Sequence, residues 1–433
     1  MSLQLLIDDA LARTPPGRCV WVALSGGLDS SLLLTLAAAA CRHHPRPLRA
    51  LHVNHGLQAA ADDFQGHCRR LCSRLGVPLF VESAVVDVAN GQGLEGAARE
   101  ARYDAFARRV APGETLWLAQ HRDDQAETFL LAALRGSGVR GLAAMPACRD
   151  WRGRRLERPL LGEARSALEA KARALGLTWI DDPSNRDVTL DRNFLRHRVL
   201  PLLETRWSGA GRALANSAAR AGEADGLLGE LAALDLVRLG GEPARLEVAG
   251  LAALSLPRRR LLVRHCCERL GLALPPATRL ETLLGQLDAR YDAEVQVAWP
   301  GGEARVWRGI LHLLTPSAGV PFDWRIDDWD GLAPIPSPFG ECRASLVSTT
   351  DTPVVGLRVA VRRGGERLRL PGRGVRDLKR LLQEMAVPPW ERARLLVVWH
   401  DGTPVAVLAP DRCQWLLVGE GWRGEPPLSP GSE

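Results

Sequence analysis

The segment Ser25-Gly26-Gly27-Leu28-Asp29-Ser30-Ser31 combines two glycines, three hydroxyl groups and one acid within seven residues. The apolar run before it, residues 19–24, predicts a buried strand, and the Leu/Ala-rich run after it predicts a helix. Glycines let the backbone approach a ligand closely, and the start of a helix directs free N–H groups and a positive dipole end at an anion. The sequence therefore predicts a strand-to-helix turn that binds a phosphate group.

Asp29 separates this turn from a Walker A loop, which carries a lysine where its helix begins. A carboxylate repels phosphate unless a divalent cation lies between them, so we expect Asp29 to bind Mg²⁺. The run Ser-Gly-Gly-Leu-Asp-Ser resembles the PP-loop of the ATP pyrophosphatase superfamily, whose members transfer AMP from ATP to an oxygen atom. That resemblance implies ATP as the ligand of residues 25–31. The alternative is a turn that only caps a helix, which would have no use for serines at both ends and a central acid.

Polar residues also mark the end of a second predicted strand, residues 47–53. His52 belongs to this strand, and Asn54 and His55 follow it. Ligands of open α/β sheets bind where the strands reach their carboxyl ends, so we expect these side chains near the nucleotide. A histidine that only bonds a neighbouring strand end is the alternative.

A helix predicted from Gly93 onward presents Glu95, Arg99 and Arg102 at spacings of four and three residues. These side chains share one helix face. Guanidinium groups suit phosphate or carboxylate, although salt bridges on a helix surface would explain the same residues.

His121, Asp124 and Glu127 follow a predicted strand, residues 115–119, at steps of three residues. They therefore stack near one face in the first turns of the next helix. An imidazole and two acids can hold Mg²⁺, orient an amine or accept a proton. Acids in a first helical turn also simply complement the helix dipole.

Six motifs follow the PP-loop and, together with it, cover residues 18 to about 203; they resemble those of the tRNA(Ile)-lysidine synthase family and stand in the family's order. They are Leu-His-Val-Asn-His-Gly-Leu, Glu-x-x-Ala-Arg-x-x-Arg-Tyr, His-x-Asp-Asp-Gln-x-Glu-Thr, Arg-Gly-Ser-Gly-x-x-Gly-Leu, Arg158-Pro159-Leu160-Leu161, and Asp182-Pro183-Ser184-Asn185 with Arg192-Asn193. The resemblance implies a carbon–nitrogen ligase that joins free L-lysine to the wobble cytidine of the CAU anticodon of tRNA(Ile). ATP would adenylate the cytosine oxygen and the lysine ε-amine would displace AMP. The product, lysidine, pairs with A and changes the amino acid that the tRNA accepts.

The resemblance also implies roles for the candidate residues. Residues 25–31 would hold the β- and γ-phosphates, and His52 with Asn54 would lie near the adenosine. A lysine amine with a pKa of ~10.4 must lose a proton before it attacks. His121 or Asp124 would take that proton or position the amine, with Glu127 in support, and the sequence leaves the choice open.

Basic residues of the N-terminal half are candidates for the anionic groups. Arg99, Arg102 and Arg140 would contact the tRNA, the lysine carboxylate or the transferred phosphate. Arg192 and Asn193 would close over the site beside the tRNA.

The length of 433 residues exceeds a single core of ~250–300 residues, so we expect several domains. The patterns predict an α/β PP-loop domain with a parallel sheet at 1–205 and a mainly helical, tRNA-contacting domain at 206–320. A proline-rich linker at 321–353 and a small, basic α/β domain at 354–433 would follow.

The formal charge of +6 is concentrated, because residues 357–380 hold nine Arg or Lys against two acids, a net +7. Such a patch suits nucleic acid, although it is also compatible with a solvated basic face. Here the sequence resembles the C-terminal domain of the longer family members, which implies tRNA contacts. The residues expected to make them are Arg362, Arg363, Arg367, Lys379, Trp390 and Arg392.

Other features narrow the function classes. No run of ~18 apolar residues and no signal-peptide pattern occur, so we expect a cytoplasmic protein without a membrane partner.

The nine cysteines are scattered and lack zinc or cluster spacing, which argues against the main rival, a PP-loop tRNA 2-thiolation enzyme with a cysteine-borne sulfur. The other rival, a non-catalytic RNA-binding relative, would not need Asp29 and the acids after His121. Whether the chain forms a homodimer stays open.

Overall fold

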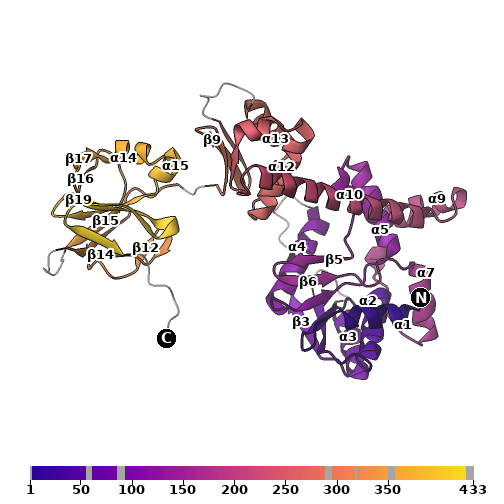
Figure 1. Cartoon of the computed structure of the whole chain (residues 1–433). Helices are drawn as coiled ribbons and strands as arrows, with labels where there is room; N and C mark the ends of the chain where they lie inside the picture. The colour runs from indigo at the N-terminus through magenta and orange to yellow at the C-terminus, as the bar shows by residue number, and fades with distance from the viewer. Residues whose placement is uncertain are drawn as a thin grey trace. The chain divides into compact units, whose positions relative to one another are not determined.

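A computed structural model describes residues 2–54, 61–84, 93–287, 295–316, 319–349 and 356–425. The chain forms two compact units, Met1–Leu231 and Ala232–Glu433, with helix α10 (Ala210–Arg238) spanning the boundary (Figure 1). His55 and the side chain of Glu95, two of the predicted site residues, lie outside the described parts.

Unit 1 is organised around a six-stranded sheet in the order β3-β2-β1-β4-β6-β5. Strands β3, β2, β1, β4 and β6 run parallel, and the edge strand β5 is antiparallel to β6. Because β2 and β3 extend the sheet on one side of β1 and β4 begins on the other, the loops that leave β1 and β4 lie side by side. Ligands bind at such a point of reversal. The strands are β1 (Val20–Ala23), β2 (Leu48–Asn54), β3 (Leu79–Ser83), β4 (Thr115–Trp117), β5 (Cys148–Trp151) and β6 (Arg154–Glu157).

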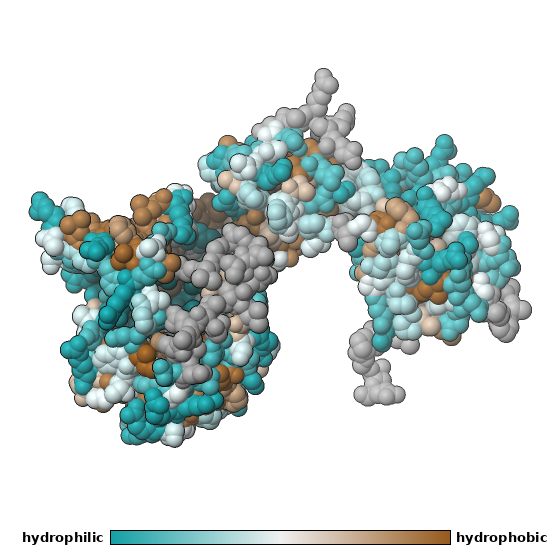
Figure 2. Space-filling view, turned by 180° about the vertical axis from the view of Figure 1, so that it is seen from behind, coloured by the Kyte–Doolittle hydropathy of each residue, from teal (hydrophilic) through white to brown (hydrophobic). Residues whose placement is uncertain are grey.

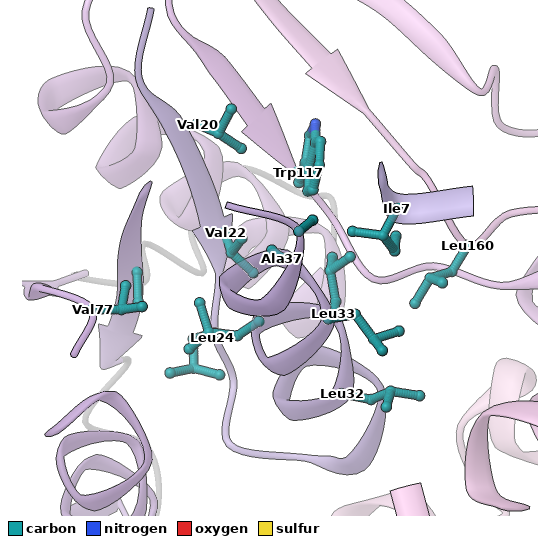
Figure 3. Packing of buried hydrophobic residues seen from close by; sticks show 14 of the residues in the cluster. Ile7, Val20, Val22, Leu24, Leu32, Leu33, Ala37, Val77, Trp117 and Leu160 are labelled. Atoms are coloured by element: carbon teal, nitrogen blue, oxygen red, sulfur yellow. The ribbon is translucent and has the colours of Figure 1, made fainter. Parts of the chain in front are cut away.

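Both faces of this sheet are buried, as expected for parallel strands. Along β1, Val20 and Val22 pack on one face and Trp21 on the other, which is the period of two of a strand. The first face packs against α2 through Leu33, as Figure 3 shows, and the second contacts Phe106 of α4. The core therefore fixes where β1 ends and α2 begins. These helices are α1 (Leu3–Ala12), α2 (Leu28–Ala40), α3 (Ala61–Leu75), α4 (Gly93–Arg109), α5 (Arg122–Leu134), α6 (Val139–Leu142) and α7 (Arg165–Ala174).

The last part of unit 1 is helical and contacts α5 through α8. It comprises η2 (Pro183–Arg186), α8 (Asp191–Phe194), a π-helical turn η3 (Leu195–Val199) and α9 (Leu200–Arg206). A π-helical turn changes the direction in which side chains leave a helix and is frequent at functional sites.

The middle segment, expected to be mainly helical, contains both helices and a sheet. Helices α11 (Val248–Ala252), α12 (Leu256–Arg269) and α13 (Ala277–Leu287) share a core with a four-stranded antiparallel sheet of order β7-β10-β9-β8. Residues 302–314 form two strands joined by a tight hairpin turn, in which Arg308 and Gly309 adopt positive φ angles of 49° and 75°. The strands are β7 (Arg245–Glu247), β8 (Gln296–Trp299), β9 (Gly302–Trp307) and β10 (Ile310–Leu314).

The C-terminal segment is rich in strands and contains two short helices. A five-stranded antiparallel sheet of order β11-β15-β18-β19-β20 has apolar clusters on both faces. Three two-stranded sheets, β12-β13, β14-β21 and β16-β17, accompany it. The elements are β11 (Arg325–Trp329), β12 (Ile335–Ser337), β13 (Gly340–Cys342), β14 (Ser345–Ser348), β15 (Leu357–Val361), β16 (Arg367–Leu370), β17 (Gly374–Asp377), α14 (Leu378–Glu384), α15 (Pro389–Arg392), β18 (Leu396–His400), β19 (Thr403–Ala409), η4 (Pro410–Arg412), β20 (Gln414–Val418) and β21 (Trp422–Glu425).

The predicted linker at 321–353 is wrong, because this stretch contributes β11 to the five-stranded sheet by pairing with β15. The prolines of this stretch had indicated a linker without regular structure. Pro336 lies in the short hairpin of β12 and β13, where a missing N–H is tolerated. The C-terminal fold therefore begins before residue 354.

The surface is mostly hydrophilic on the face shown in Figure 2, with separate hydrophobic patches. Exposed apolar side chains include Leu202, Trp207 and Leu227. Scattered residues of this kind are usual on soluble domains. Among the described helices, none is long and apolar enough to cross a bilayer.

The Leu33→Ala change is expected to lower the free energy of unfolding of unit 1 by about 2–5 kcal/mol, because it opens a cavity beneath the phosphate-binding turn. Leu33 is fully buried, whereas Leu134 of α5 is 75% exposed and Leu134→Ala serves as the control, with an effect of roughly 0.5 kcal/mol or less. Urea unfolding followed by circular dichroism measures both. Equal effects of the two changes would contradict the assigned core.

Candidate functional site

The turn between β1 and α2 is held by its own hydroxyl groups. Ser30 Oγ accepts a hydrogen bond from the Ser25 N–H (3.1 Å), donates to the Gly27 carbonyl (3.2 Å) and lies 3.0 Å from Ser25 Oγ. Gly26 has φ +93°, and a Cβ there would lie 3.2 Å from the Phe64 ring and 3.3 Å from Cys68 Sγ. Only glycine fits this position without displacing its neighbours. The backbone at the start of α2 is thus fixed in the shape predicted for a phosphate cradle.

The turn brings Asp29 to the loop that leaves β4. His121 Nε2 lies 3.7 Å from Asp29 Oδ2 and 3.5 Å from Asp124 Oδ2. The backbone N–H of His121 also donates to Asp124 Oδ2 (3.1 Å), which caps the start of α5. The predicted Asp29, His121 and Asp124 are therefore neighbours in space, although more than 90 residues separate the first from the others in the sequence.

Arg196, in the π-helical turn, joins the acids of this group. Its guanidinium donates to Glu127 Oε1 (2.6 Å), Glu127 Oε2 (3.0 Å) and Asp124 Oδ1 (2.9 Å). Arg192, one helical turn earlier, lies 3.2 Å from Glu127 Oε2 and donates to the Thr128 hydroxyl (2.8 Å). The Glu127 side chain is fully buried. Glu127 therefore holds Arg196 in place.

Burial shapes the ionisation of the two inner acids. Burial raises the pKa of the Asp29 carboxyl, and His121 and Arg165 oppose this shift. Asp29 Oδ1 is buried and lacks a hydrogen-bond partner. Burial also raises the pKa of Glu127, against the hydrogen bonds from Arg196. An orphaned, desolvated carboxylate oxygen is a suitable ligand for a hard cation such as Mg²⁺, so Asp29 fits the metal role predicted for it.

His52 closes the carboxyl end of the sheet next to the turn. Its Nδ1 bonds the Leu24 carbonyl at 2.8 Å and lies 3.6 Å from Cys68 Sγ. Burial lowers the pKa of this imidazole, so it is neutral and donates its one proton to Leu24. Asn54 lies two residues further, at the end of β2. Contacts of His52 and Asn54 with an adenosine stay predictions.

The other residues of unit 1 that were predicted to bind anionic groups or tRNA differ in exposure and in hydrogen bonding. Arg99 is exposed and its guanidinium lies 5.1 Å from the Tyr103 ring centre. Arg140 is exposed on α6. The buried Asn193 amide donates to the Ser184 and Asp187 carbonyls (2.8 and 2.9 Å), which anchors the loop around η2. Together with Arg192, whose guanidinium binds Glu127 and Thr128, these residues keep their assigned roles only as predictions.

The basic candidates of the C-terminal segment divide by exposure. Arg363, Arg367 and Lys379 are exposed, whereas Arg362 lies 3.5 Å from the buried Glu366 carboxylate. The Trp390 ring packs against His312 at 5.0 Å between ring centres. Arg392 donates to the Val387 carbonyl (2.7 Å). The exposed residues are accessible to a large anion, although Arg363 also donates to the Phe322 carbonyl (3.0 Å), and the roles of all six residues in tRNA binding stay predictions.

Arg196 and Arg165 were not singled out in the sequence. Arg196 stands four residues after Arg192, so a helical reading would have placed both on one face. The positive charge of Arg165, at the start of α7, lowers the pKa of Asp29. No motif in the sequence indicates that Arg165 lies near Asp29. Both contacts depend on how distant segments fold together.

The chain is similar to known protein families and to known whole proteins. A PP-loop domain matches residues 3–203, a TilS substrate binding domain residues 246–312 and a TilS substrate C-terminal domain residues 357–410. The tRNA(Ile)-lysidine synthase of Xanthomonas axonopodis pv. citri (strain 306) is 46% identical over 401 residues, which cover 92% of this chain and 90% of that protein. The tRNA(Ile)-lysidine synthase of Pseudomonas aeruginosa (strain PAO1) is 44% identical and covers 99% of both.

The chain belongs to the tRNA(Ile)-lysidine synthase family. The three domain matches follow the chain's own divisions. The PP-loop match covers the six-stranded sheet and the Asp29–Arg196 group, the substrate binding match falls on the four-stranded sheet, and the C-terminal match covers β15, β18 and β19 of the five-stranded sheet. The family resemblance and the parallel-sheet PP-loop fold predicted from the sequence are thus confirmed.

The Glu127→Gln change is expected to destabilise unit 1 by about 3 kcal/mol, because it leaves the Arg196 guanidinium without its buried charge partner. Glu169→Gln is the matched control, since Glu169 pairs with Arg173 on the exposed surface of α7 and such pairs contribute roughly 0–1 kcal/mol. Thermal and urea unfolding of both variants measure the difference. A Glu127→Gln protein as stable as the control would show that the buried pair does not hold the site.

The Asp29→Asn change is expected to raise the melting temperature of the ligand-free protein at neutral pH, because a desolvated charge is removed. The wild-type pKa is raised, so the wild-type carboxyl is protonated at a higher pH than an ordinary aspartate. The gain should therefore fade as the pH falls through this raised pKa, where the wild type loses its charge too. Melting curves from pH 7 to pH 4 measure it. A gain that does not depend on pH would contradict the burial of a charged Asp29.

Proposed function

We propose that this chain uses ATP to join L-lysine to the wobble cytidine of the CAU anticodon of tRNA(Ile), with release of AMP and pyrophosphate. The observation that carries the proposal is the Asp29–His121–Asp124–Arg196 group beside the glycine turn, in a chain that belongs to the lysidine synthase family over almost its whole length.

The first half-reaction needs a held triphosphate. The cytosine oxygen attacks the α-phosphorus of ATP, the bond to the β-phosphate oxygen breaks and pyrophosphate leaves. Residues 25–31 are suited to bind the leaving phosphates, because the N–H groups of the first turn of α2 lack partners within the helix. Asp29, with the phosphates, would hold a Mg²⁺ ion that neutralises the leaving charge. Desolvation of the Asp29 carboxylate favours such a ligand role.

The second half-reaction needs a neutral amine. The lysine nitrogen forms a bond to the cytosine C2, the bond from C2 to the adenylated oxygen breaks, AMP leaves and the amine gives up a proton. Asp124 is the acid we assign to the amine, because its side chain is 16% exposed while the carboxylate of Glu127 is fully buried. His121 Nε2 lies 3.5 Å from Asp124 Oδ2, so the imidazole can take over the proton that Asp124 accepts from the amine. Glu127 supports the group through Arg196.

The tRNA is the largest partner in this reaction. Arg99, Arg140, Arg192 and Asn193 in unit 1 and the basic residues of the C-terminal segment would contact the tRNA. The lysine carboxylate would meet one of the guanidinium groups of unit 1. We also infer a cytoplasmic location, and the mass of the purified protein in solution would decide between a monomer and a homodimer.

The test is incorporation of labelled lysine into an unmodified CAU-anticodon tRNA(Ile) transcript, together with AMP release. Lysine-dependent labelling should fall by at least about a hundredfold with Asp29→Asn, since an electrostatic contact of this kind contributes roughly 10²–10³ to turnover. A transcript with U at the wobble position should not be labelled. AMP release without lysine in the RNA would favour the thiolation alternative, and tight RNA binding without turnover would favour a non-catalytic relative.

A further inference from the structure

A hollow of about 330 Å³ lies in the C-terminal segment, outside the site described above. Its charged and aromatic lining consists of Arg325, Arg358, Arg363, Glu366 and Trp399. Arg325, Arg358 and Trp399 were not among the residues predicted to contact tRNA. Guanidinium groups bind phosphate, and an indole stacks on planar groups.

Strand register explains why these side chains meet. Arg358 of β15 is paired with Trp399 of β18, and Arg325 of β11 is paired with Ala360, two residues further along β15. Residues two apart on a strand share one face of the sheet. The Arg358 guanidinium carbon lies 5.1 Å from the centre of the Trp399 ring. The sheet thus presents a planar guanidinium backed by an indole, with a second guanidinium beside it.

The turn after β15 adds the third guanidinium. The Glu366 carboxylate accepts hydrogen bonds from the N–H groups of Arg363 and Gly364, both at 2.7 Å, and lies 3.5 Å from Arg362 Nε. Gly364 and Gly365 have φ angles of +99° and +83°, which a side chain would disfavour. The charge of Glu366 is therefore used inside the turn, and Arg363 is held at the hollow by a rigid backbone.

The acids that pair with these arginines lie at the surface. Arg325 Nε is 3.0 Å from Asp327, and Arg363 is 3.8 Å from Asp323, with all four side chains at least 60% exposed. Exposed pairs of this kind are weak, because water screens the charges and both side chains lose freedom, so an incoming phosphate can replace them at little cost. The hollow is therefore cationic toward a ligand.

We propose that this hollow binds an unpaired nucleotide of the tRNA, with its phosphate on Arg325 and Arg363 and its base stacked on the Arg358 guanidinium that Trp399 supports. RNA-binding proteins stack splayed bases on guanidinium planes and aromatic rings in this way. The ligand identity rests on the proposed function, because that function supplies a tRNA.

Exposed basic residues next to the hollow favour a polymer over a free nucleotide. The hairpin β16-β17 and the start of α14 follow the Glu366 turn directly in the chain. Their exposed cations are Arg367, Arg369, Arg373, Arg376, Lys379 and Arg380. A free nucleotide would need only the hollow, whereas an RNA backbone extends beyond it and gains from each further cation.

The test is binding of the unmodified CAU-anticodon tRNA(Ile) transcript to the full chain at several salt concentrations. Arg358→Ala should raise Kd about tenfold, which corresponds to ~1.4 kcal/mol and is typical for loss of one stacked base. Arg358→Lys keeps the positive charge but loses the planar guanidinium. Compared with Arg358→Ala, it should therefore restore the wild-type salt dependence but little of the affinity. Arg325→Ala should reduce the slope of log K against log salt by about one.

Arg343→Ala is the matched control, because Arg343 is 76% exposed, pairs with Glu341 and lies in the same segment outside the hollow. It should change Kd by less than about twofold, as expected for a cation outside the contact. Arg358→Ala and Arg325→Ala proteins that melt like the wild type and bind tRNA as the control does would overturn the proposal. A second ATP per chain that is lost with Arg358→Ala would assign the hollow to a free nucleotide and would overturn it too.

Lysine incorporation separates this proposal from the proposed function. At saturating tRNA, Arg358→Ala should turn over at the wild-type rate with KM for tRNA raised about tenfold, matching the change in Kd. A wild type that incorporates no lysine, yet loses RNA affinity with Arg358→Ala, would refute the ligase assignment and leave the hollow as an RNA site.

Discussion

The ionic group that joins Asp124, Glu127 and Arg196 is the interaction on which the site depends. It links the first two turns of α5 to the π-helical turn after α8, two segments about 70 residues apart in the chain. Arg196 makes three charge-assisted hydrogen bonds, and such bonds are stronger and more directional than neutral ones. Through Asp124 and His121 the same group reaches Asp29, so the orientation of the phosphate-binding turn and that of the acids on α5 are coupled.

This coupling has an energetic consequence. Buried ion pairs lose much of their attraction to desolvation, so the group contributes little net stability while making the loss of one partner costly. Asp29 is less well compensated than Glu127, because one of its oxygens is buried without a hydrogen bond. A carboxylate that is buried without a full set of hydrogen bonds lowers stability, and such a cost is common at functional sites.

The two units use different means to present charge. In unit 1, parallel strands bring loops from distant parts of the chain to one edge, so a few side chains suffice. In the C-terminal segment, antiparallel register pairs arginine with tryptophan across strands and a glycine turn fixes one more arginine. The first arrangement suits chemistry on a small group. The second suits an extended anion, for which many moderate contacts give affinity that depends on salt.

The sequence was informative where the signal is local. The glycine turn, the strands at β1, β2 and β4 and the spacing of His121, Asp124 and Glu127 are set by neighbouring residues, and they were predicted before the fold was known. Prolines in residues 321–353 misled because a proline is tolerated in a short hairpin as well as in a linker, and only pairing with β15 distinguishes the two.

What the sequence by itself determined was the set of residues able to do the chemistry, because residue type and short-range periodicity are properties of a continuous stretch of chain. Only the tertiary structure decided which of them meet. Arg196 reaches Glu127, and Arg325 joins Arg358 and Trp399, because sheet order and helix packing bring distant segments within hydrogen-bond distance or onto one face. The same packing buried the Glu127 side chain and left that of Asp124 partly exposed, a difference that the spacing of the two residues in the sequence does not show.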